Sequence, residues 1–245
     1  MNLEVCLEVY GLCHIDTASS YDNIGSTYYK LEDYSKSYDC FIKSLEIRKK
    51  MLNEKHPDMA FSYSNIGMVY HAHGDFTKAL EYYFKALEIM EKVFGKRHPD
   101  TATIYNNIGG VYNDQGYYNK ALDYFIKAVR ICEKAFGNNN HDTAMLYNNI
   151  GDVCDNLGLY EKALDNYCIA LEMLEEAVGY YHPSTAVVLN NIGITYYEQD
   201  EYSEAMRFFR EAFEIRKRIL GVNHPDTISV RKNISDTGKK LVTKG

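Results

Sequence analysis

The chain has 245 residues, of which 46% are hydrophobic and 25% are charged, and its formal net charge is −7 at pH 7. The hydrophobic share excludes a disordered chain, and the acidic balance disfavours the broad basic surface that nucleic acid or an anionic membrane would require. We therefore expect a folded protein, with neither nucleic acid nor membrane among its partners.

A period of 42 residues organises the chain. Each of the four prolines follows a histidine, at 56–57, 98–99, 182–183 and 224–225, so these pairs lie 42, 84 and 42 residues apart. Glycines recur with the same spacing at Gly25, Gly67, Gly109, Gly151 and Gly193. The spacing predicts five repeats, over residues 14–55, 56–97, 98–139, 140–181 and 182–223.

Residues 1–13 align with the later part of a repeat, and they predict the second helix of a truncated upstream unit. They lack a cationic stretch followed by an apolar run, so no signal peptide is expected. A helix without its partner exposes an apolar stacking face, with Leu3, Val5 and Leu7 among its residues. Self-association through this end is therefore one expectation.

Each repeat is expected to contain two helices joined by a turn. In the third repeat, the sequence His-Pro-Asp at 98–100 opens the first helix, because proline is tolerated in the first turn and an acid there meets the positive helix end. Gly116 interrupts the pattern, and the second helix is expected over 118–136, before a capping glycine, Gly137. The sequence therefore predicts a chain built of helix, turn and helix.

The two helices of a repeat have different patterns. At about 100° per residue, Tyr105 and Ile108 share the apolar face of the first helix in the third repeat. The polar arc of that helix contains Thr103, Asn106, Asn107, Gly110, Asn113 and Asp114. In the second helix, Ala121 and Ala128 flank Phe125 at helical spacing, and the small residues allow helices to approach closely. These three positions are predicted to form the core in the second to fifth repeats.

Residues 224–245 predict a partial sixth repeat. The first-helix pattern is repeated over 224–235, and from Asp236 onward the sequence becomes basic and polar. We expect a capping helix followed by a solvated tail.

The glycine of the first helix and the small-aromatic-small pattern of the second resemble the tetratricopeptide repeat (TPR). The 42-residue period, the His-Pro-Asp opening and the long second helix resemble the variant found in kinesin light chains. The resemblance covers nearly the whole chain, and it implies an all-α fold: a right-handed α-solenoid of stacked antiparallel helix pairs, the TPR superhelix. It also implies a non-catalytic scaffold or adaptor whose first helices line a concave groove for an extended peptide.

The resemblance places the polar arc in this groove. An amide side chain offers both a donor and an acceptor, so it can pair with a peptide backbone whatever the ligand's side chains are. An asparagine recurs at one position in six first helices, from Asn23 to Asn233. This row of asparagines, an asparagine ladder, could hold the backbone of an extended peptide. The predicted peptide-binding residues are Asn65, Asn106, Asn107, Asn113, Asn148, Asn149, Asp152, Asn156, Asn190, Asn191 and Tyr197. Alternatively, the asparagines bond to neighbouring helices and stabilise stacking, and the two roles can coexist.

The charge of the polar arc predicts the kind of partner. Lys30 and Lys232 are its lysines, and its acids are Asp22, Asp114, Asp152, Asp155, Glu198 and Asp236. A clamp for the acidic tails of chaperones is therefore not expected. The expected partner is a neutral to basic protein or peptide. Two alternatives to groove binding are a structural assembly module that associates through repeat-end stacking, and a sensor or adaptor part of a longer TPR protein.

Enzymatic, metal-binding and cofactor functions have no support in the sequence. The histidines that precede the prolines recur at each junction, so they are interpreted as helix-start residues. His71 and His73 point apart on a helix and cannot share a metal. Acidic pairs at 32–33 and 200–201 occupy turns, where adjacent carboxylates are solvated. The six cysteines form no C-x-x-C pair, which predicts buried, reduced thiols in a cytoplasmic protein.

Overall fold

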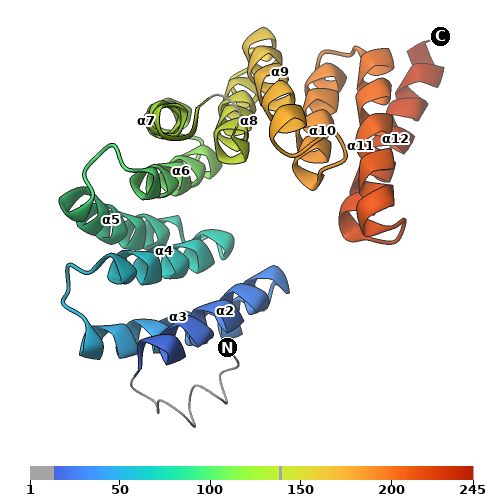
Figure 1. Cartoon of the computed structure of the whole chain (residues 1–245). Helices are drawn as coiled ribbons and strands as arrows, with labels where there is room; N and C mark the ends of the chain where they lie inside the picture. The colour runs from blue at the N-terminus through green and yellow to red at the C-terminus, as the bar shows by residue number, and fades with distance from the viewer. Residues whose placement is uncertain (1–13, 138–139, 245) are drawn as a thin grey trace. The chain divides into compact units, whose positions relative to one another are not determined.

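The computed structural model describes residues 14–137 and 140–244. Within these residues the chain forms eleven α-helices and no β-strand (Figure 1). The helices are α2 (Ile15–Lys30), α3 (Tyr34–Met51), α4 (Pro57–Ala72), α5 (Phe76–Val93), α6 (Pro99–Asp114), α7 (Tyr118–Phe136), α8 (His141–Asn156), α9 (Tyr160–Ala177), α10 (Pro183–Glu198), α11 (Tyr202–Leu220) and α12 (Pro225–Lys244). The expected second helix over 1–13, with its exposed stacking face, lies outside the described residues.

The helices form antiparallel pairs within two compact units, residues 1–124 and 125–245, whose boundary lies inside α7. In the first unit α2 packs against α3, α4 against α5, and α3 and α5 pack against the pair that follows. In the second unit α8 packs against α9, α10 against α11, and α12 packs on α11. The expected all-α solenoid of stacked helix pairs is confirmed, while the limits of the individual repeats remain a prediction.

A histidine caps the start of most first helices. His98 Nδ1 accepts a hydrogen bond from the backbone N–H of Asp100 at 3.3 Å, and His14, His56, His182 and His224 do the same two residues ahead. In the fourth repeat the cap is Asn140, whose Oδ1 accepts from the N–H groups of Asp142 and Thr143. These side chains satisfy backbone donors that the first turn leaves unpaired. The interpretation of the junction histidines as helix-start residues is confirmed.

The turn between the two helices of a repeat requires a left-handed residue. Gly116 has φ 77° at this position, and Gly74 and Gly158 are similar. In the first and fifth repeats the position is held by Glu32 and Asp200, with φ of 58° and 63°. Both acids are exposed turn residues, as expected, but they adopt a conformation that glycine takes without steric strain.

In the first, second, fourth and fifth repeats, the core lies where a second-helix aromatic ring meets a first-helix glycine. Ala205, Phe209 and Ala212 are buried, as are the equivalent residues of the other repeats after the first. A Cβ atom on Gly193 would lie 2.6 Å from the ring of Phe209, so glycine is needed for the helices to approach this closely. Gly67 meets the ring of Tyr83 in the same way. The predicted core positions are confirmed.

Two expectations differ from the structure. The solvated tail expected after Ser235 is helical, since α12 continues to Lys244. Val242 stands at the position that forms the left-handed turn in the five complete repeats, and its β-branched side chain disfavours that conformation. Among the described cysteines, Cys168 is exposed, contrary to the expected burial, while Cys40, Cys132 and Cys154 are buried free thiols.

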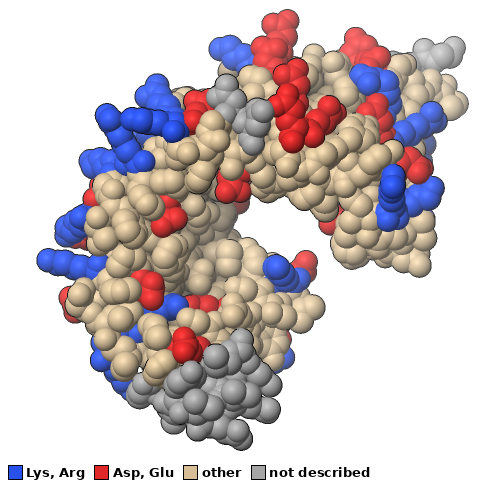
Figure 2. Space-filling model, viewed as in Figure 1, with Lys and Arg blue, Asp and Glu red and all other residues tan. Residues whose placement is uncertain are grey.

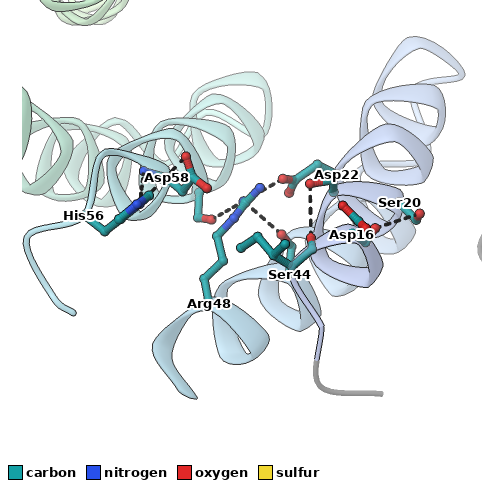
Figure 3. Close-up of polar contacts among 10 residues, drawn as sticks. Asp16, Ser20, Asp22, Ser44, Arg48, His56 and Asp58 are labelled. Atoms are coloured by element: carbon teal, nitrogen blue, oxygen red, sulfur yellow. Dashed lines mark hydrogen bonds and ion pairs between the residues drawn. The ribbon is translucent and has the colours of Figure 1, made fainter. Parts of the chain in front are cut away.

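The first repeat also contains a buried ion pair that the periodicity did not reveal. Arg48 Nη1 lies 2.6 Å from Asp22 Oδ2 and donates to the hydroxyl oxygens of Ser44 and Ser62 at 3.0 and 2.7 Å (Figure 3). Burial raises the pKa of Asp22, and the charge of Arg48 opposes this shift. The next repeat has Met90 at the position of Arg48, so this polar cluster replaces an apolar contact between α2, α3 and α4.

Candidate functional site

The predicted peptide-binding residues all lie on first helices: α4, α6, α8 and α10. In the first unit α4 contacts α6, and in the second unit α8 contacts α10. First helices of successive repeats therefore form one layer in each unit. This first-helix layer is the candidate site.

The recurrent asparagines of the layer form hydrogen bonds between repeats. Asn107 Nδ2 donates to Ser64 Oγ at 3.3 Å in the first unit. In the second unit, Asn191 Nδ2 donates to Asn148 Oδ1 at 3.0 Å, and Asn233 Nδ2 donates to Asn190 Oδ1 at 3.0 Å. Each of these bonds joins residues 43 apart, so an asparagine meets the residue that precedes its counterpart one repeat earlier. These contacts are those of the stacking alternative.

The carboxylate of Asp152 connects two other predicted residues, Asn148 and Asn191, in the second unit. Its Oδ1 accepts hydrogen bonds from the Tyr167 hydroxyl at 2.7 Å and from Asn191 Nδ2 at 2.9 Å, while Asn148 Nδ2 lies 3.4 Å from Oδ2. Burial raises the pKa of Asp152 to about 6, and the nearby charge of Asp155 adds to the rise, while the bond from Tyr167 opposes it. The α8 and α10 surfaces are therefore held together around one carboxyl group.

The other predicted residues differ in exposure. Asn148 is only 3% exposed, so it belongs to the interface between repeats, unlike the open polar arc expected there. Asn156 is exposed. The half-buried members of the set are Asn65, Asn106, Asn107, Asn113, Asn149, Asp152, Asn190, Asn191 and Tyr197. A hydrogen bond from Asn65 partly opposes the rise that burial causes in the pKa of Asp22 in the first unit.

Sequence reasoning missed several polar partners in this layer. Thr195 Oγ1 donates to Asp155 Oδ1 at 2.7 Å in the second unit. His71 Nε2 lies 2.7 Å from Asp114 Oδ2 in the first unit, so His71 joins α4 to α6. These pairs are separated by 40 and 43 residues, close to one repeat length. A search for polar pairs one period apart could have found them.

Three carboxylates on the first helices of the second unit, those of Asp152, Asp155 and Glu198, form no ion pair among the described residues. Burial raises the pKa of Asp155 and of Glu198, and Asp155 raises that of Glu198 further. No lysine or arginine contributes to the pKa shifts of these two residues or of Asp152. Figure 2 shows further acidic side chains over α9, whereas lysine and arginine side chains project around α5 of the first unit. The first-helix layer of the second unit is the more acidic one.

Within the described residues, no helix has the length and apolar character needed to cross a membrane. The same part of the chain contains no group of three or more histidine, cysteine, aspartate or glutamate side chains that could hold a metal ion.

Family comparisons match the repeats directly. One tetratricopeptide repeat family profile matches residues 16–92, 74–125 and 100–176, and a second tetratricopeptide repeat profile matches residues 185–226. These matches cover more than half of the chain. No curated protein sequence matches the chain significantly.

Solved structures share the fold at low sequence identity. BtubC (BKLC) from P. vanneervenii is 21% identical with a TM-score of 0.71, over 91% of this chain and 87% of that chain. Nearly identical TPR-like repeats of a putative kinesin light chain from P. anserina are 16% identical with a TM-score of 0.65, over 84% and 98%. A Rap protein complexed with Competence and Sporulation Factor is 16% identical with a TM-score of 0.71, over 92% and 66%. The chain is similar to kinesin-light-chain-like repeats in fold, and it belongs to the tetratricopeptide repeat family.

Proposed function

We propose that this protein is a non-catalytic protein–protein interaction scaffold that binds an extended segment of a partner along its first-helix layer. One observation carries the proposal: Asn107 in the first unit, and Asn191 and Asn233 in the second, are each held by a hydrogen bond to the preceding repeat, so each amide is pre-oriented within its own unit. Side chains that are already fixed lose little rotamer freedom on binding, which favours affinity. Stacking and binding are then two roles of the same residues.

Asn191 illustrates how one side chain can have both roles. Its Nδ2 group donates to Asn148 and to Asp152, which uses its two amide hydrogens. Its Oδ1 atom then serves as the acceptor for a backbone N–H of the partner. Recognition of this kind depends on the partner's main chain, and neighbouring side chains provide selectivity.

The kind of partner is inferred from charge and from a relative. The Rap protein of the same fold is complexed with Competence and Sporulation Factor, so this architecture is compatible with binding such a factor. In our protein, Asp152, Asp155 and Glu198 give the layer of the second unit an acidic character. A neutral to basic protein segment is therefore the proposed partner, and the cytoplasm is its proposed location.

The proposal is tested with 12-residue peptides selected from a display library on the intact chain. Combined replacement of Asn107, Asn149 and Asn191 by alanine is expected to weaken peptide binding by more than about tenfold, because several hydrogen bonds to the peptide backbone are lost. Calorimetry measures affinity, and circular dichroism reports whether the variant remains folded. A folded triple variant with unchanged affinity would refute the proposal.

A matched pair of single variants separates ligand binding from stacking. Ser64→Ala removes the acceptor of the Asn107 bond but leaves the asparagine in place. Asn107→Ala removes both the bond and the amide. If Asn107 contacts the peptide, Asn107→Ala weakens binding more than Ser64→Ala does. Equal effects would mean that Asn107 acts through stacking alone.

Structural assembly through the repeat ends remains the alternative function. The residues at 1–13 on which that expectation depends lie outside the described structure. Light scattering over a concentration series distinguishes the two functions, because an assembly module increases in mass with concentration. A monomer at every concentration would exclude assembly.

A further inference from the structure

A pocket of about 230 Å³ opens beside the last complete helix pair. Residues from α10, α11 and α12 line it: Ile194, Tyr197, Glu198, Phe209, Asn233 and Asp236. All six belong to the second compact unit. The pocket therefore lies on the first-helix layer, where α12 follows α10.

The pocket combines an apolar interior with a polar edge. Phe209 is 2% exposed, and its ring lies against Gly193, so it forms a rigid apolar base. Ile194 and Tyr197 are half-buried on α10, and both pack against the core cluster that contains Phe209. This surface suits the aliphatic stem of a long side chain, which gains by covering apolar surface while its polar end stays at the edge.

Two carboxylates and one amide provide the polar edge. In the described part of the chain, Glu198 has no hydrogen bond or ion pair, and Asp155 lies close enough to raise its pKa. Asp236 pairs with Lys239 at 2.8 Å, but this lysine is 74% exposed, and such surface pairs are weak and easily exchanged. Asn233 Nδ2 is held by Asn190, so its Oδ1 is oriented as an acceptor. Acceptors and negative charge surround an apolar interior.

We infer that this pocket binds an arginine side chain of the partner, with its stem over Phe209 and Ile194 and its guanidinium between Glu198 and Asp236. Charge complementarity selects a cationic occupant. The guanidinium offers five donors in a fixed planar fork and can lie flat against an aromatic ring such as Phe209, whereas an ammonium group is a compact, strongly hydrated charge with three donors. The inference rests on the proposed function, because it assigns one residue type to a segment bound along the layer. The α10–α12 pocket would set the partner's register.

The test uses a small probe, so that it does not depend on finding the partner. N-acetylarginine methylamide is titrated into the full chain while NMR follows the isoleucine methyl groups. The methyl signal of Ile194 is expected to shift and saturate, while that of Ile47 in the first unit stays unchanged. N-acetylcitrulline methylamide has nearly the same shape without the charge, and it is expected to bind about tenfold more weakly. Equal binding of the two probes, or tighter binding of the lysine analogue, would overturn the inference.

Variants at the pocket edge give opposite expected effects. Glu198→Gln removes the unpaired carboxylate and is expected to weaken arginine binding by about fivefold or more. Lys239→Ala removes the cation that is hydrogen-bonded to Asp236 and leaves the weaker influence of Lys232, so the same probe is expected to bind more tightly. Glu204→Gln, on the exposed surface of α11 outside the pocket lining, is the matched control without effect. An unchanged affinity in both pocket variants would contradict the assignment.

The two proposals can fail separately. The Asn107, Asn149 and Asn191 triple variant leaves the pocket lining intact, so it is expected to bind the arginine probe as the native chain does. Loss of peptide binding without loss of probe binding supports both proposals. If peptides without arginine bind equally well and the arginine probe does not shift the Ile194 methyl signal, the assignment of the pocket to arginine is wrong, while the scaffold proposal still stands.

Discussion

The carboxyl group of Asp152 lies inside the second compact unit, where it accepts hydrogen bonds from Tyr167 and Asn191. Burial raises its pKa from the ordinary value of 3.8 to about 6. The folded chain therefore binds more protons than the unfolded chain between these two pH values. As pH rises through this window, the carboxylate must ionise in a poorly hydrated place, so its contribution to stability falls.

Asp152→Asn is predicted to stabilise the protein at neutral pH. Asparagine has nearly the same shape, it can still accept from Tyr167 and Asn191, and it carries no charge. At about 1.4 kcal/mol per pKa unit, the gain in the free energy of unfolding should be roughly 1 to 3 kcal/mol at pH 7.5 and close to zero at pH 4. Chemical denaturation at both pH values measures it. A gain of equal size at both would show that charge is not the cause, and the exposed substitution Asp165→Asn should change little at either.

Residue-level features were predictable where they recur in the sequence. The capping histidines and the core around Phe209 follow from repeated spacing and from helix chemistry. The hydrogen-bond partner of Asn107 could not be predicted from the repeat spacing. It depends on how far one first helix is shifted along the next, and the bonded residues are 43 apart, one more than the repeat length of 42. Arg48 and Asp22 form an ion pair in one repeat alone, and a periodic pattern contains no signal for it.

The turn between paired helices is the element in which a local rule is broken. Glu32 adopts φ 58°, although the corresponding residues of three other repeats are glycines. A side chain in this left-handed conformation is sterically strained. At the equivalent position α12 has Val242, a β-branched residue for which the left-handed conformation is especially unfavourable, and this helix continues to Lys244.

Glu32→Gly is predicted to raise the free energy of unfolding of the first unit by about 1 kcal/mol. Relief of left-handed strain outweighs the extra backbone freedom that glycine has in the unfolded chain. Thermal unfolding followed by circular dichroism is the measurement. The reverse control is Gly116→Ala, at φ 77°, which should destabilise by a similar amount. A lower melting temperature for Glu32→Gly would show that the glutamate side chain stabilises the turn by a contact of its own.

At the scale of the whole molecule, stability should be a sum of local terms. Helices contact their own partner and the adjacent pairs, as α10 contacts α9 and α11, so each core is small and shared only with neighbours. In solenoids of this kind, repeats and their interfaces contribute separately. A chain with one central core would instead lose its structure everywhere when that core is damaged.

Gly193→Val tests this directly. The added Cβ would stand 2.6 Å from the buried ring of Phe209, and crowding of this kind typically costs about 1 to 3 kcal/mol. Hydrogen exchange measured by mass spectrometry is expected to show lost protection in α10, α11 and α12 and retained protection in α2 to α5. Gly110→Ala, whose Cβ would meet its nearest neighbour, His71, at 3.5 Å, should leave exchange unchanged. Equal loss of protection in α2 to α5 would mean that the chain unfolds as one cooperative body, and binding along the first-helix layer would then be coupled from one end to the other.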